Sequence, residues 1–359
     1  MPQGDSQAGS PGFYYGMQNY AIKGGLEWGG DEKSESFVTI PGAMGGVSRL
    51  SDEWVFGFGA FAPKQEKRHL VTADSARRNF SNYDYDDQTL WLGPAIAWSP
   101  AGSGISVGAG LYAVYRECKI SRSTFSTGEY AMNGAIDLSV LGVLAAAGVQ
   151  IDLGDGWRAG AVIQSPNVRV WDDGTFSLNA SFDRRGADED AGYYSTDVRA
   201  DNYIPFQLGV GIGRTVPGKW GFSLDANYHP SANFDFMRWN IDGARVSESI
   251  HMHSVLDAGL GGELIVAERY PIRAGVYTAF SSIRVPEDPE DSDFITSDVD
   301  MYGVTFSIGR RSENMIVNFG FDVAFGSGHD LAEGYSGKRV RTDCDRRVML
   351  TTVSTTYFF

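Results

Sequence analysis

Long hydrophobic runs are missing from this chain of 359 residues. The longest apolar stretch, Leu138 to Val149, is interrupted by Ser139 and two glycines. A helix needs about 20 consecutive apolar residues to cross a bilayer, so the sequence excludes a membrane protein built of helices. The mean hydropathy of −0.22 still allows a membrane β-barrel, because each barrel strand gives every second side chain to a polar lumen.

Basic residues are also scarce. The chain has 30 Lys and Arg against 45 Asp and Glu, which gives a net charge of −15. Binding to nucleic acid requires clustered cations that neutralise phosphates, so this class of partner is excluded.

Cysteine is nearly absent, since only Cys118 and Cys344 occur. Two cysteines are compatible with an oxidising compartment but cannot define a disulfide framework. A bond between them would need loops folded inward over a barrel mouth, because the strands that carry them are not expected to be neighbours. The first residues also lack a basic and apolar secretory signal, so we expect a mature or truncated form, or a misplaced start.

What the sequence does contain is alternation with a period of two, together with 13% aromatic residues and 45 glycines. In residues 220 to 228, Trp220, Phe222 and Leu224 fall on one face, while Ser223 and Asp225 fall on the other. Residues 204 to 212, 302 to 308 and 317 to 325 repeat the pattern. A strand with one face in lipid and the other in water has this pattern. Aromatic residues at strand ends, as in a membrane girdle, are Trp54, Trp98, Trp157, Trp220 and Tyr270.

These runs predict about fourteen antiparallel strands, an even number as in bacterial barrels. Their expected ranges are 17 to 28, 36 to 49, 53 to 62, 87 to 99, 104 to 118, 135 to 152, 157 to 170, 203 to 214, 219 to 229, 253 to 266, 270 to 281, 300 to 310, 315 to 326 and 347 to 359. The expected fold is therefore all-β, a transmembrane antiparallel β-barrel.

The connections between these strands alternate strictly in length. Short turns are expected at 51 to 52, 100 to 103, 154 to 156, 215 to 218, 267 to 269 and 311 to 314. Long polar loops are expected at 63 to 86, 119 to 134, 171 to 202, 230 to 252, 282 to 299 and 327 to 346. Short periplasmic turns and long extracellular loops are typical of outer-membrane barrels. The alternating last strand ends in Phe359, which resembles the signal read by the barrel assembly machinery.

The order of segments resembles the FadL family of outer-membrane transporters for long-chain fatty acids and aromatic hydrocarbons. The likeness is carried by residues 38 to 41 followed by 52 to 63, by residues 92 to 98 followed by 105 to 115, and by residues 156 to 160 leading to Gln164-Ser165-Pro166. It implies transport of small hydrophobic molecules across the outer membrane of a Gram-negative bacterium, by a monomer in contact with lipid and lipopolysaccharide, without enzymatic activity or a cofactor.

One feature of that family has no match here. The family places an N-terminal plug with an Asn-Pro-Ala signature inside the barrel, and residues 1 to 16 are too few to form it. Either the plug is missing from the sequence or the protein works without one. We expect a short N-terminal segment at 1 to 16 and a barrel at 17 to 359.

The resemblance also implies a route of capture by outer loops, passage into the lumen and lateral exit at a kinked third strand. Apolar loop residues expected to capture substrate are Phe125, Tyr130, Met132, Trp171, Phe176 and Leu178. Packing of the loops over the mouth is the alternative role for them. Gly57, Gly59 and Pro63 are expected to form the kink, since Gly weakens a strand and Pro removes a ladder donor, although such residues also simply end strands. Arg158 is the expected partner of a charged head group, with an ion pair to Asp152 as the alternative.

Other chemistry has weaker support. His251 and His253 share a strand face but have no carboxylate or Cys at ligand spacing, so a metal site is not expected. His229 and Ser231 are the nearest pairing for a phospholipase, and sequence adjacency says little about geometry. The acidic run from 287 to 293 could attract Ca²⁺ or form a solvated loop. A general diffusion porin and a structural or adhesive barrel remain alternative functions.

Overall fold

The computed structural model describes residues 6–23, 32–73, 79–127, 130–184, 187–241, 244–285, 287, 297–333 and 339–358. Within these ranges the regular structure is entirely β-strand. No helix in the described part of the chain is long and apolar enough to cross a membrane.

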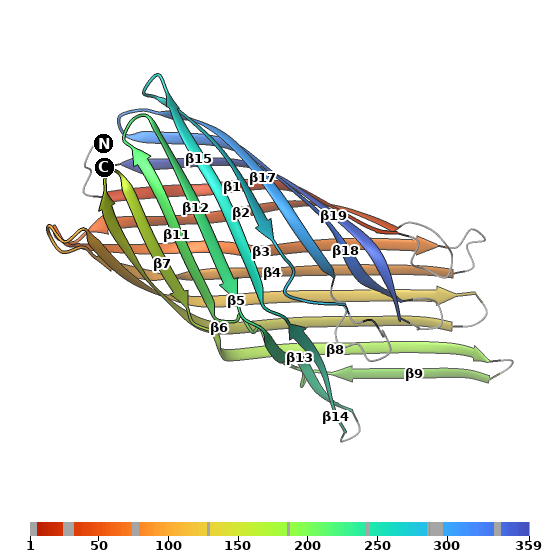
Figure 1. Ribbon diagram of the computed structural model, residues 1–359. Coiled ribbons are helices and arrows are strands. Elements are labelled where there is room, and N and C mark those ends of the chain that lie inside the picture. The colour runs from red at the N-terminus through yellow and green to blue at the C-terminus, as the bar shows by residue number, and fades with distance from the viewer. Residues whose placement is uncertain are drawn as a thin grey trace.

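Fourteen antiparallel strands pair in a closed ring (Figure 1). In ring order they are β1 (Ser6–Lys23), β2 (Glu32–Arg49), β3 (Trp54–Ala73), β4 (Asn79–Trp98), β5 (Ile105–Ser126), β6 (Tyr130–Gly154), β7 (Trp157–Gln164), β11 (Gln207–Val216), β12 (Trp220–His229), β15 (Val255–Val266), β16 (Tyr270–Ala279), β17 (Asp298–Arg311), β18 (Met315–Glu333) and β19 (Arg339–Phe358). The last strand closes on the first, with Phe358 opposite Gln7. The predicted barrel is confirmed.

Several strands are much longer than their expected ranges. Strand β3 was expected to end at 62 and continues to Ala73, and β18 continues to Glu333. Much of the expected loops 63 to 86, 119 to 134 and 327 to 346 is therefore strand. The first strand begins at Ser6, so residues 6 to 16 belong to the barrel wall rather than to a separate segment. The outer ends of β3 and β18 were missed because the expected ranges followed an apolar face, whereas a ladder of backbone hydrogen bonds continues beyond the membrane without one.

Two expected loops contain strands of their own. Strands β8 (Val168–Arg184) and β9 (Ala187–Ser195) lie in the expected loop at 171 to 202, and β8 pairs with the outer half of β6. Strands β10 (Arg199–Ala200), β13 (Ala232–Ile241) and β14 (Ala244–Met252) form a separate three-stranded sheet. The β13–β14 hairpin occupies the expected loop at 230 to 252.

The six predicted short turns are confirmed, and they lie at the end of the barrel that holds both chain termini (Figure 1). The turn between β6 and β7 has positive φ at Gly154, Asp155 and Gly156 (84°, 51° and 81°). Ala267 and Glu268 reach positive φ between β15 and β16. Consecutive residues with positive φ match the twist of the flanking strands, which is why two strands can be joined so tightly.

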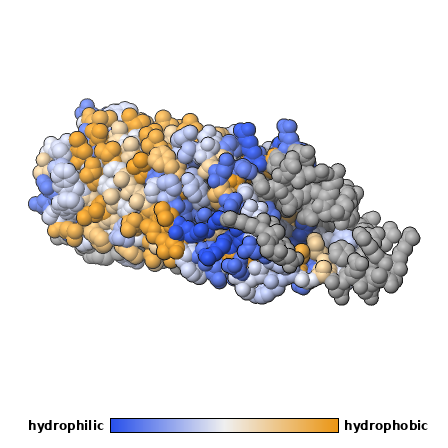
Figure 2. All heavy atoms as spheres, turned by 90° about the horizontal axis from the view of Figure 1, so that it is seen from below, coloured by the Kyte–Doolittle hydropathy of each residue, from blue (hydrophilic) through white to orange (hydrophobic). Residues whose placement is uncertain are grey.

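Exposed apolar side chains form a band around the half of the barrel next to the turns (Figure 2). On β4 they run from Leu90 to Trp98, and on β5 from Ile105 to Tyr115. About nine to eleven strand residues cross a bilayer, so the band has the height of a hydrocarbon core. At its turn side, the rings of Trp54 and Trp98 stack with centroids 6.1 Å apart, as the predicted girdle requires. The outer halves of the long strands lie beyond this band.

Candidate functional site: a closed outer mouth above a lumen cavity

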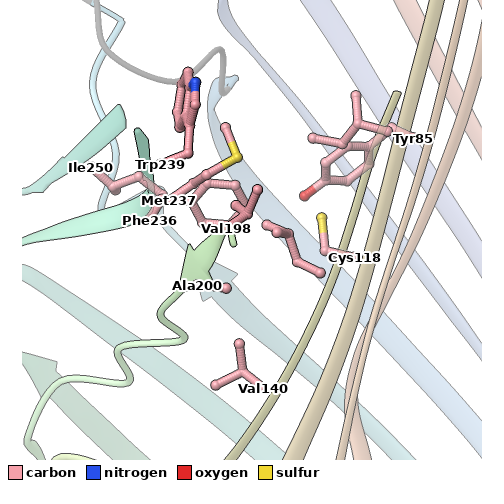
Figure 3. Packing of buried hydrophobic residues seen from close by; sticks show 11 residues of the cluster. Tyr85, Cys118, Val140, Val198, Ala200, Phe236, Met237, Trp239 and Ile250 are labelled. Carbon is pink, nitrogen blue, oxygen red and sulfur yellow. The ribbon is translucent and has the colours of Figure 1, made fainter. Parts of the chain in front are cut away.

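The outer mouth of the barrel is closed by a cluster of buried apolar side chains, which we call the mouth cluster (Figure 3). Its members from the barrel wall are Tyr85, Cys118, Ile120, Leu138 and Val140; those from the outer segments are Val198, Ala200, Phe236, Met237, Trp239 and Ile250. The β13–β14 hairpin therefore packs its apolar face against the inner surface of β4, β5 and β6.

A β-bulge in β13 turns this hairpin toward the lumen. The register between β13 and β14 shifts between Asp235 and Met237, which leaves Phe236 as the extra residue. In a regular strand, neighbouring side chains point to opposite faces, but here Phe236 and Met237 are both buried, with 1% and 2% of their surface exposed. The bulge lets two consecutive side chains enter the mouth cluster.

An ion-pair layer lies next to the mouth cluster, on the side of the membrane band. Asp87 is fully buried. Its carboxylate accepts hydrogen bonds from Nε and Nη2 of Arg116 at 2.8 Å each and from Nζ of Lys64 at 2.6 Å. Burial by itself raises the pKa of Asp87, but the two cations outweigh burial and hold that pKa well below its usual range. Tyr85 donates a further hydrogen bond to the same carboxylate at 2.9 Å. The negative charge is thus fully compensated within the wall.

A second closure joins β3 to strands on the other side of β1 and β2. Arg68 donates to Glu66 on its own strand and lies 3.5 Å from Asp330 on β18, while Arg346 on β19 lies 3.5 Å from Glu66. Beside these ion pairs, Leu70 packs in an apolar cluster with residues of β17, β18 and β19, including Cys344. The outer lumen is therefore narrow between β3 and β17–β19.

The seam between β2 and β3 is paired over only part of its length. The ladder runs from Arg49 opposite Val55 to Ala43 opposite Phe61. Beyond it, among the described residues, β2 pairs only with β1 and β3 pairs only with β4. At the same level the β3–β4 register shifts between Phe61 and Lys64, which leaves one extra residue in β3 beside Pro63.

A cavity of about 860 Å³ lies in the lumen at the level of the membrane band, against β2 to β7, β11 and β12. Half of the residues that line it are Gly or Ala, including Gly57, Ala95, Gly108, Ala146, Gly160 and Gly211, and polar residues such as Gln150, Arg158 and Asp225 also line it. Small side chains leave the lumen open here, whereas Val114 and Leu144, which are almost completely buried, lie between the cavity and the ion-pair layer. Tyr112 also lines the cavity, and its ring lies 6.0 Å from that of Phe61 at the seam.

The structure places four of the six expected capture residues on one face of the paired strands β6 and β8. Directly paired residues share a face of a sheet, and Phe176 pairs with Ile136, which packs against the mouth cluster. Leu178 lies opposite Gly134 and Met132 opposite Ala180, so both share the inner face of β6 and β8 with Phe176. Tyr130 is on that face as well, two residues before Met132.

The other two expected capture residues do not join this group. Phe125 lies opposite Ala131 and Trp171 opposite Leu141, on the outward face, and their side chains are 48% and 49% exposed. The sequence could not assign these two residues to a face, because it did not show that these loops are strands, in which neighbouring positions point to opposite sides.

The remaining expected site residues lie in the lumen cavity or in the wall at β3. Arg158 lines the lumen cavity and its Cα pairs with that of Asp152. Gly57 also lines the cavity. Gly59 lies under the ring of Phe61, where a Cβ atom would come within 2.8 Å of that ring. Pro63 lies in the register shift of β3 and does not end the strand.

Other sequence expectations are resolved or fall outside the described residues. Cys118 and Cys344 are buried thiols in two different clusters and do not form a disulfide. Within the described ranges no group of His, Cys, Asp and Glu is arranged to hold a metal. Most of the acidic run at 287 to 293 and the terminal Phe359 lie outside those ranges.

Sequence reasoning missed the residues that close the mouth. Phe236, Met237 and Trp239 occur in a stretch that was expected to be a polar loop, although its aromatic content was a usable signal. Asp87 and Arg116 lie far apart in the sequence, and only the pairing of β4 with β5 brings them together.

No protein family model matches the chain, and no curated protein sequence matches it. Solved structures do match it. A FadL homologue of Pseudomonas aeruginosa has a TM-score of 0.74 at 13% identity, covering 99% of this chain and 90% of the homologue. The Pseudomonas putida toluene transporter TodX has a TM-score of 0.69 at 14% identity, covering 100% and 90%. The Ralstonia pickettii toluene transporter TbuX has a TM-score of 0.64 at 15% identity, again covering 100% and 90%. The fold is that of FadL-type outer-membrane barrels.

Proposed function

We propose that this protein carries small hydrophobic molecules across the outer membrane of a Gram-negative bacterium. The observation that carries the proposal is the apolar mouth cluster, which closes the outer end of the lumen. A general porin needs an open, water-filled pore. An apolar closure instead favours molecules that gain free energy on leaving water, about 0.8 kcal/mol for each buried CH₂ group.

The route has three parts. Tyr130, Met132, Phe176 and Leu178, on the inner face of β6 and β8, are proposed to capture the molecule beside the mouth cluster. The cavity lined by Gly and Ala then receives it, with Arg158 available to a polar head group. The unpaired part of the β2–β3 seam, next to Phe61 and Tyr112, is proposed as a lateral exit toward the membrane.

The similar structures support this proposal, since two of them are described as toluene transporters. The neutralised charge of the ion-pair layer is also compatible with the passage of hydrophobic molecules. Asp87 is neutralised by Arg116 and Lys64, so a molecule that crosses this layer meets no uncompensated carboxylate there. We propose a transporter, which acts as a monomer in contact with lipid and lipopolysaccharide and is inserted by the barrel assembly machinery, rather than an enzyme.

Reconstitution of the full chain in liposomes tests the proposal. We expect uptake of labelled oleate or toluene well above that of empty liposomes, and no uptake of a labelled disaccharide. Equal flux of all three compounds would show a general porin. Flux of none of them would favour a structural or adhesive barrel.

Phe61→Ala tests the exit route in the same liposomes. It should slow the flux of hydrophobic molecules severalfold, because it removes the apolar ring that such a molecule is proposed to contact as it leaves through the seam. Phe325→Ala, which deletes an exposed ring on β18, should leave the flux unchanged and serves as its control.

A further inference from the structure

The side chain of Phe236 is buried beside the guanidinium group of Arg116. Only 1% of Phe236 is exposed, and the carbon at the centre of the Arg116 guanidinium lies 5.0 Å from the centre of its ring. Asp87 binds the Nε and Nη2 edge of the same guanidinium. The guanidinium therefore binds a carboxylate through two N–H groups while its central carbon lies over an aromatic ring, a combination that the compact ammonium group of Lys could not provide.

The rest of this position belongs to the barrel wall. Tyr85 of β4, Cys118 of β5 and Leu138 of β6 come from adjacent strands of the ring and are at most 9% exposed. Their positions are set by continuous ladders between β4, β5 and β6. These residues and the guanidinium of Arg116 form the recess that the hairpin fills.

The hairpin that fills the recess is separate from the barrel ring. Among the described residues, β13 pairs outside its own hairpin only with β10, at Arg199 opposite Arg238 and Ala200 opposite Met237. On β14, Met252 forms a single bridge with Ile283. Phe236 O also accepts a backbone hydrogen bond from Asp201 N at 3.0 Å. Moving the hairpin would leave the ladders of the barrel ring intact, so its side-chain packing in the mouth cluster is the main contact that a displacing molecule has to replace.

We propose that the guanidinium of Arg116 and the wall residues around it form a binding site for an aromatic ring, and that Phe236 occupies this site until an aromatic molecule displaces the β13–β14 hairpin. The inference rests on the proposed function only for the arrival of hydrophobic molecules at the mouth. An aromatic ring is favoured over an alkyl chain, because the negative face of its π-system is attracted to the guanidinium. The hairpin is thus a lid whose own side chain imitates the substrate.

Two native thiols allow a direct test. Cys118 lies in the mouth cluster and Cys344 in the separate cluster of β3 with β17–β19, and each is 1% exposed. Burial raises the pKa of Cys118 to about 12, so the reactive thiolate is scarce while the lid is closed. Maleimide labelling of the folded full chain, with both cysteine peptides quantified by mass spectrometry, reports on both positions in one sample.

Phe236→Ala should increase the labelling rate of Cys118 at least tenfold and leave that of Cys344 unchanged. Toluene should then slow the labelling of Cys118 severalfold by filling the vacated site, whereas n-heptane should have much less effect. Phe325→Ala should alter neither rate. An unchanged rate at Cys118, or equal protection by toluene and n-heptane, overturns the proposal.

A second variant retains Phe236 and tests displacement of the lid. In Met237→Cys, toluene should accelerate labelling at position 237 and n-heptane should not; no acceleration by toluene overturns the role of the hairpin as a lid. Liposome flux separates this inference from the proposed function. Protection by toluene without any hydrophobic flux would overturn the proposed transport alone, and flux without selective protection would overturn the aromatic site alone.

Discussion

At the scale of single residues, the face of the strand on which a charged side chain lies decides how much its ion pair contributes to stability. Asp86 and Asp87 are neighbours on β4 and pair with lysines of β3, Asp86 with Lys67 at 2.7 Å and Asp87 with Lys64 at 2.6 Å. The side chain of Asp86 is 41% exposed and that of Asp87 is fully buried. Solvent screens the first pair, whereas in the second the carboxylate is buried beside Arg116 and only Lys64 reaches water.

These two carboxylates form a matched pair for mutation. Asp87→Asn should lower the free energy of unfolding by about 3 to 5 kcal/mol, because it leaves the buried guanidinium of Arg116 without its partner. Asp86→Asn should cost less than about 1 kcal/mol, as expected for an exposed ion pair. Urea unfolding of both variants in micelles measures the difference, and equal costs would contradict the buried role of Asp87.

The pH dependence of stability follows from Glu66. Burial raises the pKa of Glu66, but Arg68, Arg346 and Lys64 outweigh burial and lower it to about 2. A carboxylate with a lowered pKa stabilises the fold fully above its unfolded pKa, near 4, and loses this contribution as the pH falls through its folded pKa. The contribution is at most about 3 kcal/mol, from the usual 1.4 kcal/mol per pH unit.

We therefore expect the difference in unfolding free energy between the natural protein and Glu66→Gln to stay constant from pH 7 to pH 5. It should shrink progressively from about pH 4 to pH 2. Equilibrium unfolding at a series of pH values measures it, and the variant provides the reference because its amide does not titrate. A difference that shrinks between pH 7 and pH 5 would show that Glu66 is not held ionised by its cations.

At the scale of elements, one extra residue in β3 lets this strand separate from β2 while it stays paired with β4. Between Phe61 and Lys64, β3 advances three positions while β4 advances two, from Trp91 to Thr89. Pairing of β3 with β2 ends at the same level, at Phe61. A bulge bends its strand and increases the local twist, which explains how β3 can leave β2 while it remains paired with β4.

Deletion of Pro63 should remove the bulge without reversing any side chain, since Phe61 and Lys64 would then lie two positions apart, as Trp91 and Thr89 do. The β2–β3 ladder is expected to extend beyond Phe61, which should slow the exchange of amide hydrogens in residues 64 to 72 and reduce hydrophobic flux in liposomes severalfold. Pro63→Ala keeps the extra residue and should retain the flux. Unchanged hydrogen exchange after the deletion would show that the bulge is not the cause of the unpaired seam.

At the scale of the whole molecule, the apolar band fixes the position of the barrel in the membrane. The band ends at the turns, where Trp54, Trp98, Trp220 and Tyr270 are exposed. The ion-pair layer and the mouth cluster lie beyond its other edge, so they face the outside. The barrel is thus closed outside the membrane and hollow within it.

Depth within this band should set the cost of a charge on the outer surface. Leu260 lies in the middle of β15 and Leu264 lies near the turn, and their side chains are 51% and 54% exposed. Leu260→Arg should destabilise the barrel by about 2 to 4 kcal/mol and Leu264→Arg by about 1 kcal/mol or less. Unfolding from lipid vesicles measures both, and similar costs would contradict the assigned depth.

The barrel, its fourteen strands, its turns and its aromatic girdle could all be predicted from the sequence. These features depend on local causes: a strand between lipid and water must alternate, and a tight turn needs residues that tolerate positive φ. Gly154 to Gly156 could therefore be placed from the sequence, as could the outward face of Trp220 and Leu224.

The closure of the outer end, by contrast, depends on tertiary contacts. The long strands beyond the membrane have no lipid to impose alternation, and residues 63 to 86 therefore looked like a loop. The fold of the outer hairpin depends on a bulge at Phe236 and on contacts with strands more than a hundred residues earlier. Asp87 meets Arg116 only through the pairing of β4 with β5, and Glu66 meets Arg346 only when the ring closes. Such contacts are set by strand register and by the shape of the lumen, which a one-dimensional pattern does not contain.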